Sequence, residues 1–320
     1  MIGEGGAAQI AGDVAAAAQL ACLLEATAPK PGNVSPGRRF GDLAYEDLLV
    51  SAAAIGGPLA GVATRPLGTT IRLAIEATRR WTRSNTNLGM VLLLTPLARA
   101  AGLELRPRVG TELARTPSPS VGTELARTPS PPRGTEYELR CAVRTVLDET
   151  TIEDAREVYA AIRLAAPGGL GHVDQQDVAN DPTVTLLEAM RLGAGRDGIA
   201  HEYASGFAVT FETAAPALRR GRADGLSWND AIVETFLTTL AATPDSHVAR
   251  RGGAALAADV SRRACSALAA GGVRTEEGRR AIADMDRALR DPHHLANPGT
   301  TADLTAAAIF VVLVDGMMRT

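Results

Sequence analysis

The sequence predicts an all-α protein, a single helical-bundle domain of roughly a dozen helices with a disordered proline-rich insertion. Hydrophobic residues make up 46% of the 320 residues but aromatic residues only 3%. Alanine is the commonest residue, so small side chains must do most of the packing, which favours closely packed helices. Aromatic and β-branched strand patterns are scarce, which excludes a β-sandwich or barrel. The length fits one large or two small domains.

Apolar residues recur at helical spacing along most of the chain, and almost no strand pattern interrupts them. Cap signals support two helix starts: Thr150 and Glu153 have capping-box spacing, and Asp181 precedes Pro182 as an N-cap before a first-turn proline. The expected helices span residues 8–27, 42–60, 68–83, 87–101, 138–147, 151–165, 183–192, 196–219, 227–241, 248–269, 275–290 and 301–314. We therefore predict one all-helical domain over residues 1–320.

A tandem duplication interrupts this domain. The eleven letters of residues 109–119 (VGTELARTPSP) recur at 121–131, and a third start follows at Gly134. Each copy offers little apolar surface beyond valine and leucine, so the copies cannot stack as a solenoid. We interpret residues 109–134 as a low-complexity insertion and expect deletion of 109–132 to be tolerated.

Charge and hydropathy exclude several partners. The net charge is −3 and the isoelectric point about 6.0, without the basic excess of a nucleic-acid binder. The N-terminus lacks the positive start of a signal peptide. The most apolar run, residues 304–314, is too short to cross a bilayer and predicts a buried helix. We expect a cytoplasmic protein without a membrane partner.

The three cysteines lie far apart within alanine-rich helical patterns. Cys22, Cys141 and Cys265 have no CxxC spacing, and their number is odd. The sequence therefore predicts three buried thiols rather than a metal site or disulfides.

Lys30 is the chain's only lysine, and it lies in a stiff turn. Pro29 and Pro31 flank it and Gly32 follows, so a helix ends where one ammonium would be held in place. A compact, rotatable ammonium suits a phosphate or a negatively charged leaving oxygen. We predict a functional Lys30, with an ordinary surface lysine as the alternative.

Two helix starts carry more polar residues than a cap needs. Residues 85–89 (NTNLG) precede an apolar run, and residues 297–303 (NPGTTAD) place Thr300 and Asp303 at capping spacing. Helix N-termini bind anions and favour Asn and Thr as caps. Both runs are therefore predicted to bind substrate, with plain capping as the alternative.

Acidic residues gather in a glycine-rich segment at 167–190. It carries His172, Asp174, Asp177 and Asp181 ahead of a helix. Magnesium keeps several waters and takes one or two carboxylates together with substrate phosphates. Because Asp181 is most simply an N-cap, Asp174 and Asp177 are the predicted Mg²⁺ ligands.

Two further segments bear on phosphate binding. Residues 193–198 (GAGRDG) match GxGxxG literally, but they follow a helix rather than a strand, so we reject a dinucleotide fold. Asp197, within this segment, and His201 lie four residues apart on the expected helix, as either an ordinary surface pair or an inward-facing polar pair. Residues 244–253 (PDSHVARRGG) combine an acid, a histidine and two guanidinium groups, which match phosphate oxygens. No Walker A lysine, GxSxG, HExxH or kinase catalytic loop is present.

Five blocks in order, PKPGNV at 29–34, NTNLG at 85–89, DVANDPTVTLLEAM at 177–190, PDSHVARRGG at 244–253 and NPGTTADL at 297–304, resemble the triphosphoribosyl-dephospho-CoA synthase family. The resemblance covers nearly the whole chain except the duplicated insertion. It implies an all-helical transferase that moves the 5-triphosphoribosyl group of ATP to a ribose hydroxyl of 3′-dephospho-CoA and releases adenine. The product would be a prosthetic-group precursor.

This chemistry assigns roles to the residues singled out above. The predicted catalytic residues are Lys30, Asp42, Asp174 and Asp177, of which Asp174 and Asp177 also bind Mg²⁺. The predicted substrate-binding residues are Pro31, Gly32, Asn33, Asn85, Thr86, Asn87, Gly89, Asp197, Asp245, His247, Arg250, Arg251, Asn297, Gly299, Thr300 and Asp303. The expected partners are ATP and 3′-dephospho-CoA or a related acceptor, with a homodimer as a further expectation.

Two blocks depart from the family pattern. Better-known members read close to NTHKG where this chain has NTNLG at 85–89, and of their HxDM element only Asp42 survives here. A divergent ribosyl or phosphoribosyl transferase of another cofactor pathway, for instance pterin-linked one-carbon metabolism, therefore stays open. A non-catalytic nucleotide-binding helical protein is the third alternative.

Overall fold

The computed structural model describes residues 4–105, 136–169 and 171–318. Within these ranges the chain forms fifteen α-helices and no strand, apart from an isolated bridge between Ser35 and Arg38. The all-α prediction is confirmed. The predicted insertion, 109–134, lies outside the described residues.

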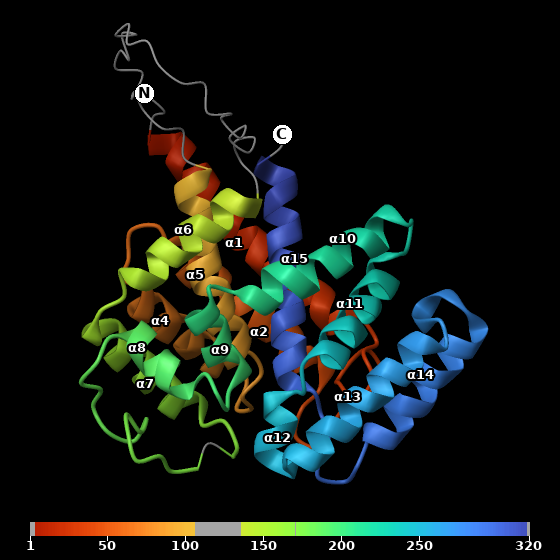
Figure 1. The fold of residues 1–320 in the computed structure, drawn as a ribbon. Coiled ribbons are helices and arrows are strands. Elements are labelled where there is room, and N and C mark those ends of the chain that lie inside the picture. The colour runs from red at the N-terminus through yellow and green to blue at the C-terminus, as the bar shows by residue number, and fades with distance from the viewer. Residues whose placement is uncertain (1–3, 106–135, 170, 319–320) are drawn as a thin grey trace, which may run out of the picture.

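Helix α15 (Gly299–Met318) runs through the middle of the molecule, with α1 (Glu4–Thr27) beside it (Figure 1). One continuous apolar core draws its residues from Val14 through Val314. On one side of α15 lie α4 (Leu67–Arg79), α5 (Leu88–Glu104), α6 (Glu136–Asp148), α7 (Ile152–Ala165), α8 (Leu186–Gly193) and α9 (Gly198–Ser205). On the other lie α10 (Ala215–Ala223), α11 (Trp228–Ala242), α12 (Ser246–Gly252), α13 (Ala254–Ala269) and α14 (Glu276–Leu289).

Three expected helices are each interrupted. The helix expected at 42–60 divides at Ile55 into α2 (Tyr45–Ala54) and α3 (Gly56–Ala60), where the side chain of Gln19 donates to the carbonyl of Ala53 at 2.8 Å. The helix expected at 196–219 breaks at Gly206 and Phe207, both left-handed, before the π-helical turn Thr210–Ala214 and α10. The helix expected at 248–269 breaks at Gly253, whose φ is +89°. Apolar periodicity alone reveals none of these breaks.

Two expected caps are also shifted. Helix α7 starts with Thr151, which shares a reciprocal capping box with Asp154, rather than with the expected pair Thr150 and Glu153. Helix α8 starts four residues after Asp181, at the capping box of Thr185 and Glu188. Asp181 is therefore not an N-cap.

The two longest apolar helices pass a length and composition test for crossing a membrane. They are Gly6–Thr27, with mean hydropathy 1.5, and Gly299–Met318, with mean hydropathy 1.6. The apolar run at 304–314 is part of a longer helix than expected, because α15 begins at Gly299 and ends at Met318. The prediction that it is buried is confirmed, since α15 packs against α1, α5 and α11.

The cysteines only partly follow expectation. Cys22 is buried in the core, but Cys141 and Cys265 are exposed. In alanine-rich helices the contrast between inner and outer faces is weak, so a cysteine on the outer face is hard to recognise.

Candidate active site

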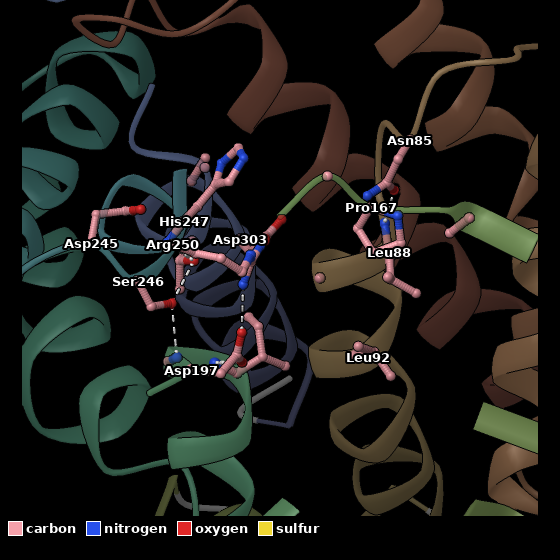
Figure 2. Close-up of a pocket in the computed structure, with 18 of the residues that line it drawn as sticks. Asn85, Leu88, Leu92, Pro167, Asp197, Asp245, Ser246, His247, Arg250 and Asp303 are labelled. Carbon is pink, nitrogen blue, oxygen red and sulfur yellow. Dashed lines mark hydrogen bonds and ion pairs between the residues drawn. The ribbon is translucent and has the colours of Figure 1, made fainter. Parts of the chain in front are cut away.

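A cavity of about 1430 Å³ opens where the first turns of α5, α9, α12 and α15 meet. Figure 2 shows side chains from these turns facing one another. Unpaired N–H groups at helix N-termini favour negative charge. The cavity also gathers the scarce titratable side chains: four of the chain's five histidines line it. These are His201, His247, His293 and His294, and the lining arginines are Arg79, Arg83, Arg196, Arg250 and Arg251.

Arg250 is the cation at the centre of one wall. Its Nη1 lies 2.9 Å from Oδ2 of Asp197, whose Oδ1 caps α9 by accepting from the amides of Ile199 and Ala200 (Figure 2). Nε of Arg250 is buried and has no hydrogen-bond partner among the described residues. One carboxylate thus orients the guanidinium and leaves donor capacity for a ligand. We call this set, with α12, the Arg250 corner.

Asp245 joins the ends of α12 and α15 at this corner. Its Oδ1 accepts from the amide of Val248 at 2.9 Å, and its Oδ2 accepts from the amide and hydroxyl of Thr301, each at 2.7 Å. Ser246 continues the link, because its hydroxyl lies 2.9 Å from both the amide of Gly198 and the hydroxyl of Thr300. Three helix starts are therefore fixed relative to one another.

Asp303 projects from the first turn of α15 toward the start of α5. A Cβ at Gly89 would lie 1.9 Å from its Oδ2, so any side chain there would force the Asp303 carboxyl group to move. Burial, followed by the charges of Glu25, Asp245 and Asp197, raises the pKa of Asp303 well above its ordinary value. This carboxyl group holds a proton more tightly than an exposed aspartate does.

His247 is an uncharged imidazole at neutral pH. Burial, followed by the nearby Arg250 and Arg251, lowers its pKa to about 4. Its ring packs against Gly299, where a Cβ would lie 2.3 Å from Nδ1. The cavity therefore contains both a carboxyl group that favours its protonated form and a neutral nitrogen base.

Lys30 does not reach this cavity. Its ammonium is 1% exposed, lies 3.0 Å from Oε1 of Glu25, and donates to the carbonyls of Glu25 and Ala28. The ammonium is held in place as predicted, but its contacts hold it against the end of α1. Neither a phosphate-facing lysine nor a surface lysine describes it.

The rest of the Lys30 turn separates into two parts. Pro31 and Gly32 lie outside the cavity lining, and the amide of Gly32 donates to Oδ1 of Asp286 at 2.9 Å. Gly32 has φ +77° and sits tightly against Leu289, which explains the glycine. Asn33, by contrast, lines the cavity.

The predicted residues at 85–89 all line the cavity, but much of their polar capacity is used within the fold. The Oδ1 of Asn85, two residues before the N-cap Asn87, accepts from the amide of Leu88 at 3.2 Å. Thr86 meets the hydroxyl of Ser51 at 2.5 Å, and Asn87 donates to Thr78 at 3.1 Å. Capping and interhelical bonds thus account for more of this block than the sequence indicates.

The two predicted Mg²⁺ ligands lie outside the cavity lining. Oδ2 of Asp177 meets Nδ1 of His172 and the amide of Val173, each at 2.9 Å, and Oδ1 accepts from the amide of Ala179 at 2.8 Å. These bonds lower the pKa of Asp177, the amides of Ala179 and Val173 first. They shape the loop, and Asp174 likewise lies away from the cavity. The described residues contain no group of three or more His, Cys, Asp or Glu suited to a metal.

The other predicted residues do come together. Asp42, Asp197, Asp245, His247, Arg250, Arg251, Asn297, Gly299, Thr300 and Asp303 all line the cavity. Arg251 is already engaged, because its guanidinium donates to the carbonyls of His293 and His294. Sequence reasoning missed Phe40 and His294, which stack on each other at the cavity wall. The scarcity of histidine and aromatic residues is the signal that could have found them.

Comparison with known proteins identifies relatives of this chain. A family model described as ATP:dephospho-CoA triphosphoribosyl transferase matches residues 11–319. A protein from Pseudomonas putida is 34% identical over 135 residues, covering 42% of this chain and 48% of the relative. One from Klebsiella pneumoniae is 34% identical over 119 residues, covering 37% and 42%. Both are named for 2-(5″-triphosphoribosyl)-3′-dephosphocoenzyme-A synthase activity, and the chain spans about half the length of the curated relatives it matches.

A solved structure agrees in fold. This crystal structure, described as a triphosphoribosyl-dephospho-CoA synthase from Archaeoglobus fulgidus, is 26% identical with a TM-score of 0.58. The match covers 84% of this chain and 99% of that one.

Proposed function

Because the chain belongs to the ATP:dephospho-CoA triphosphoribosyl transferase family, we propose that it transfers the 5-triphosphoribosyl group of ATP to a ribose hydroxyl of 3′-dephospho-CoA and releases adenine. The observation that carries the proposal is the convergence of four helix starts, five arginines and four histidines on one cavity. All five sequence blocks contribute residues to its lining, although they lie far apart in the chain.

The cavity suits an intact triphosphate. The starts of α5, α9 and α15 direct the positive ends of their helix dipoles at the cavity, although several of their amides already bond to Asn85, Asp197 and Asp245. Arg250 keeps an unpartnered Nε beside them. Arg79, Arg83 and Arg196 add guanidinium groups along the lining. A transferase that retains all three phosphates needs this binding more than it needs groups that activate a phosphorus atom.

Glycosyl transfer requires two proton movements. The bond from C1′ of ribose to the adenine nitrogen breaks, the base leaves with the electron pair and gains a proton, and the acceptor hydroxyl bonds to C1′ and loses its proton. Asp303 has the raised pKa of a proton donor for the leaving adenine. The lowered pKa of His247 makes its imidazole a weak base, so it would accept a hydrogen bond from the acceptor hydroxyl, whose proton passes to water. The carboxylate of Asp197 would stabilise positive charge that develops on the sugar.

Magnesium enters this proposal with the nucleotide. The predicted ligands Asp174 and Asp177 lie outside the cavity lining, and the described residues contain no group of three or more His, Cys, Asp or Glu suited to a metal. We therefore treat Mg²⁺ as part of the ATP substrate, where it would offset phosphate charge.

A second candidate is ribosyl transfer to a different acceptor. Leu88, Met90 and Leu92 give the α5 side of the cavity an apolar surface. Leu88 stands where the family block carries a lysine, so an acceptor with less negative charge would suit this side better.

The test is adenine release. Purified protein is incubated with Mg²⁺·ATP and 3′-dephospho-CoA, and free adenine is measured by chromatography, with the acceptor omitted as control. Adenine that depends on the acceptor supports the proposal. Release with another acceptor alone favours the second candidate, and ATP binding without any release contradicts both.

A further inference from the structure

One wall of the cavity is formed by two loops, residues 33–43 and 290–298, here called the loop wall. Buried Asp286 joins the loops: its Oδ1 accepts from the amide of Gly32 and from Nη2 of Arg290, each at 2.9 Å. The same Nη2 donates to the carbonyl of Asn33 at 2.8 Å, and Arg38 pairs with Asp286. The loop wall is thus held from behind by a charged network, which leaves its front to the cavity.

His294 lies on this wall in an unusual backbone conformation. Its φ of +52° is left-handed, a region that non-glycine residues rarely occupy. Its amide donates to the carbonyl of Asp291 at 3.1 Å, its carbonyl accepts from Arg251 at 3.1 Å, and its ring stacks on Phe40 with centroids 3.9 Å apart and planes 20° apart. Strained residues held by several contacts cluster at ligand sites.

Three polar atoms of the loop wall have no hydrogen-bond partner among the described residues, and one of them, Oγ of Ser35, belongs to a residue outside the cavity lining. The other two are Nδ1 of His294 and Nδ2 of Asn33, whose residues line the cavity, and Asn33 is 7% exposed. A buried donor without a partner is costly, and such groups are ordinarily paired. A ligand that occupies the cavity can supply the missing partners.

We propose that His294, backed by Phe40, and the side-chain amide of Asn33 form a subsite for the adenine ring of a nucleotide substrate. The flat imidazole surface offers a stacking contact, and the unpartnered amide nitrogen of Asn33 can donate to a ring nitrogen of adenine. Nδ1 of His294 lies in the plane of the stacking ring, so it is left for a group beside the base, such as a ribose hydroxyl. The inference rests on the proposed function in one respect: both proposed substrates carry adenine. The source is the base of either ATP or dephospho-CoA.

Three variants and one control test the subsite. His294→Gly removes the ring and suits the left-handed backbone, Asn33→Ala removes the amide, and His294→Phe restores a stacking ring without the nitrogen. His172→Ala is the matched control, because it removes an imidazole outside the cavity lining. Thermal melting by circular dichroism first establishes that each variant is folded.

Calorimetric titration then measures the affinity for Mg²⁺·ATP, 3′-dephospho-CoA and inorganic tripolyphosphate. We expect His294→Gly to weaken the binding of one adenine nucleotide roughly tenfold or more, since base stacking on a side chain is worth that much. Asn33→Ala should weaken the same nucleotide by about fivefold, the effect of one lost hydrogen bond. Tripolyphosphate affinity should stay unchanged, and His294→Phe should recover part of the loss. Weakening of ATP alone assigns the subsite to the donor, and weakening of dephospho-CoA alone assigns it to the acceptor.

The proposed subsite and the proposed function can be contradicted independently, because the binding measurements require no turnover. Wild-type protein that binds ATP without releasing adenine contradicts the function, while a loss on His294→Gly still supports the subsite. Folded His294→Gly and Asn33→Ala proteins that bind both nucleotides like wild type overturn the subsite, whatever the activity. A wild type that binds neither adenine nucleotide overturns it as well. If His294→Gly does not fold, His294→Phe and Asn33→Ala decide by the same measurements.

Discussion

The Lys30 turn and the Arg250 corner each place a cation beside a carboxylate, yet the two cations have different surroundings. The ammonium of Lys30 is 1% exposed, and Glu25 and Ala28 surround it with acceptors. The guanidinium of Arg250 is 22% exposed, contacts Asp197, and keeps a buried Nε without a partner in the described residues. The donors of the Lys30 ammonium are therefore all bonded within the fold. The Arg250 guanidinium is oriented by one carboxylate and keeps a donor for a ligand.

The difference follows from the two side chains. A single ammonium is satisfied by three acceptors, and the end of α1 supplies three. A guanidinium carries five donors in a planar fork, so one carboxylate aligns it without exhausting it. A rare residue in a stiff turn therefore indicates a position with strict requirements, but not which way the residue faces.

The largest effect is expected from Lys30→Met, which leaves Glu25 buried without its partner. Burial already raises the pKa of Glu25 despite Lys30. Removing one member of a buried ion pair costs about 3–5 kcal/mol. Urea unfolding at neutral pH should show this loss of stability.

The double variant Lys30→Met, Glu25→Gln is the control, because it removes both charges and should recover much of the loss. A Lys30→Met protein that keeps wild-type stability but loses ATP affinity would contradict the structural role.

Arg250→Ala should affect ATP binding strongly and stability little, the reverse of Lys30→Met. We expect ATP to bind roughly 10- to 100-fold more weakly, the range for lost charged hydrogen bonds, with a small change in stability. Titration with ATP measures the first and urea unfolding the second. Arg262→Ala is a matched control, since Arg262 pairs with Asp259 on the exposed surface. Unchanged ATP affinity in Arg250→Ala would show that the Arg250 corner binds no phosphate.

Gly89→Ala tests the contact between the starts of α5 and α15. The new methyl would overlap Oδ2 of Asp303, so we expect a destabilisation of about 1–3 kcal/mol and reduced adenine release. Gly316→Ala is the matched control, because a methyl group added at that position would meet open space. A Gly89→Ala protein with wild-type stability and turnover would mean that Asp303 moves away without consequence.

The smallest effect concerns His247 and pH. Its folded pKa is about 4 against an ordinary 6.5, so as pH falls through 6.5 the unfolded chain takes up the proton before the folded one. The stability that the neutral imidazole provides is therefore lost between pH 6.5 and 4. His247→Gln should show a shallower decline than wild type when urea unfolding is compared at pH 7 and pH 5. Parallel declines would place an ordinary pKa at His247.

The sequence predicted the helical class and most helix positions, because apolar periodicity is local. It also selected blocks that meet in space, as Asp197, Arg250 and Thr300 do. Side-chain direction at turns could not be predicted from the sequence. Lys30 and Asp177 both turn toward partners a few residues away in the chain and bond to them. His294 was missed for a related reason: its importance depends on a left-handed backbone and on Phe40, more than 250 positions earlier.

Helix α15 carries a consequence for how the protein is made. It packs against α1 and supplies Thr300, Thr301 and Asp303 to the cavity, although every other described helix precedes it in the chain. During synthesis the earlier helices must therefore wait with apolar surface uncovered until α15 leaves the ribosome, a condition that favours aggregation. Chaperones that shield nascent chains would therefore prevent more aggregation for this fold than for one whose neighbouring helices are also neighbours in sequence.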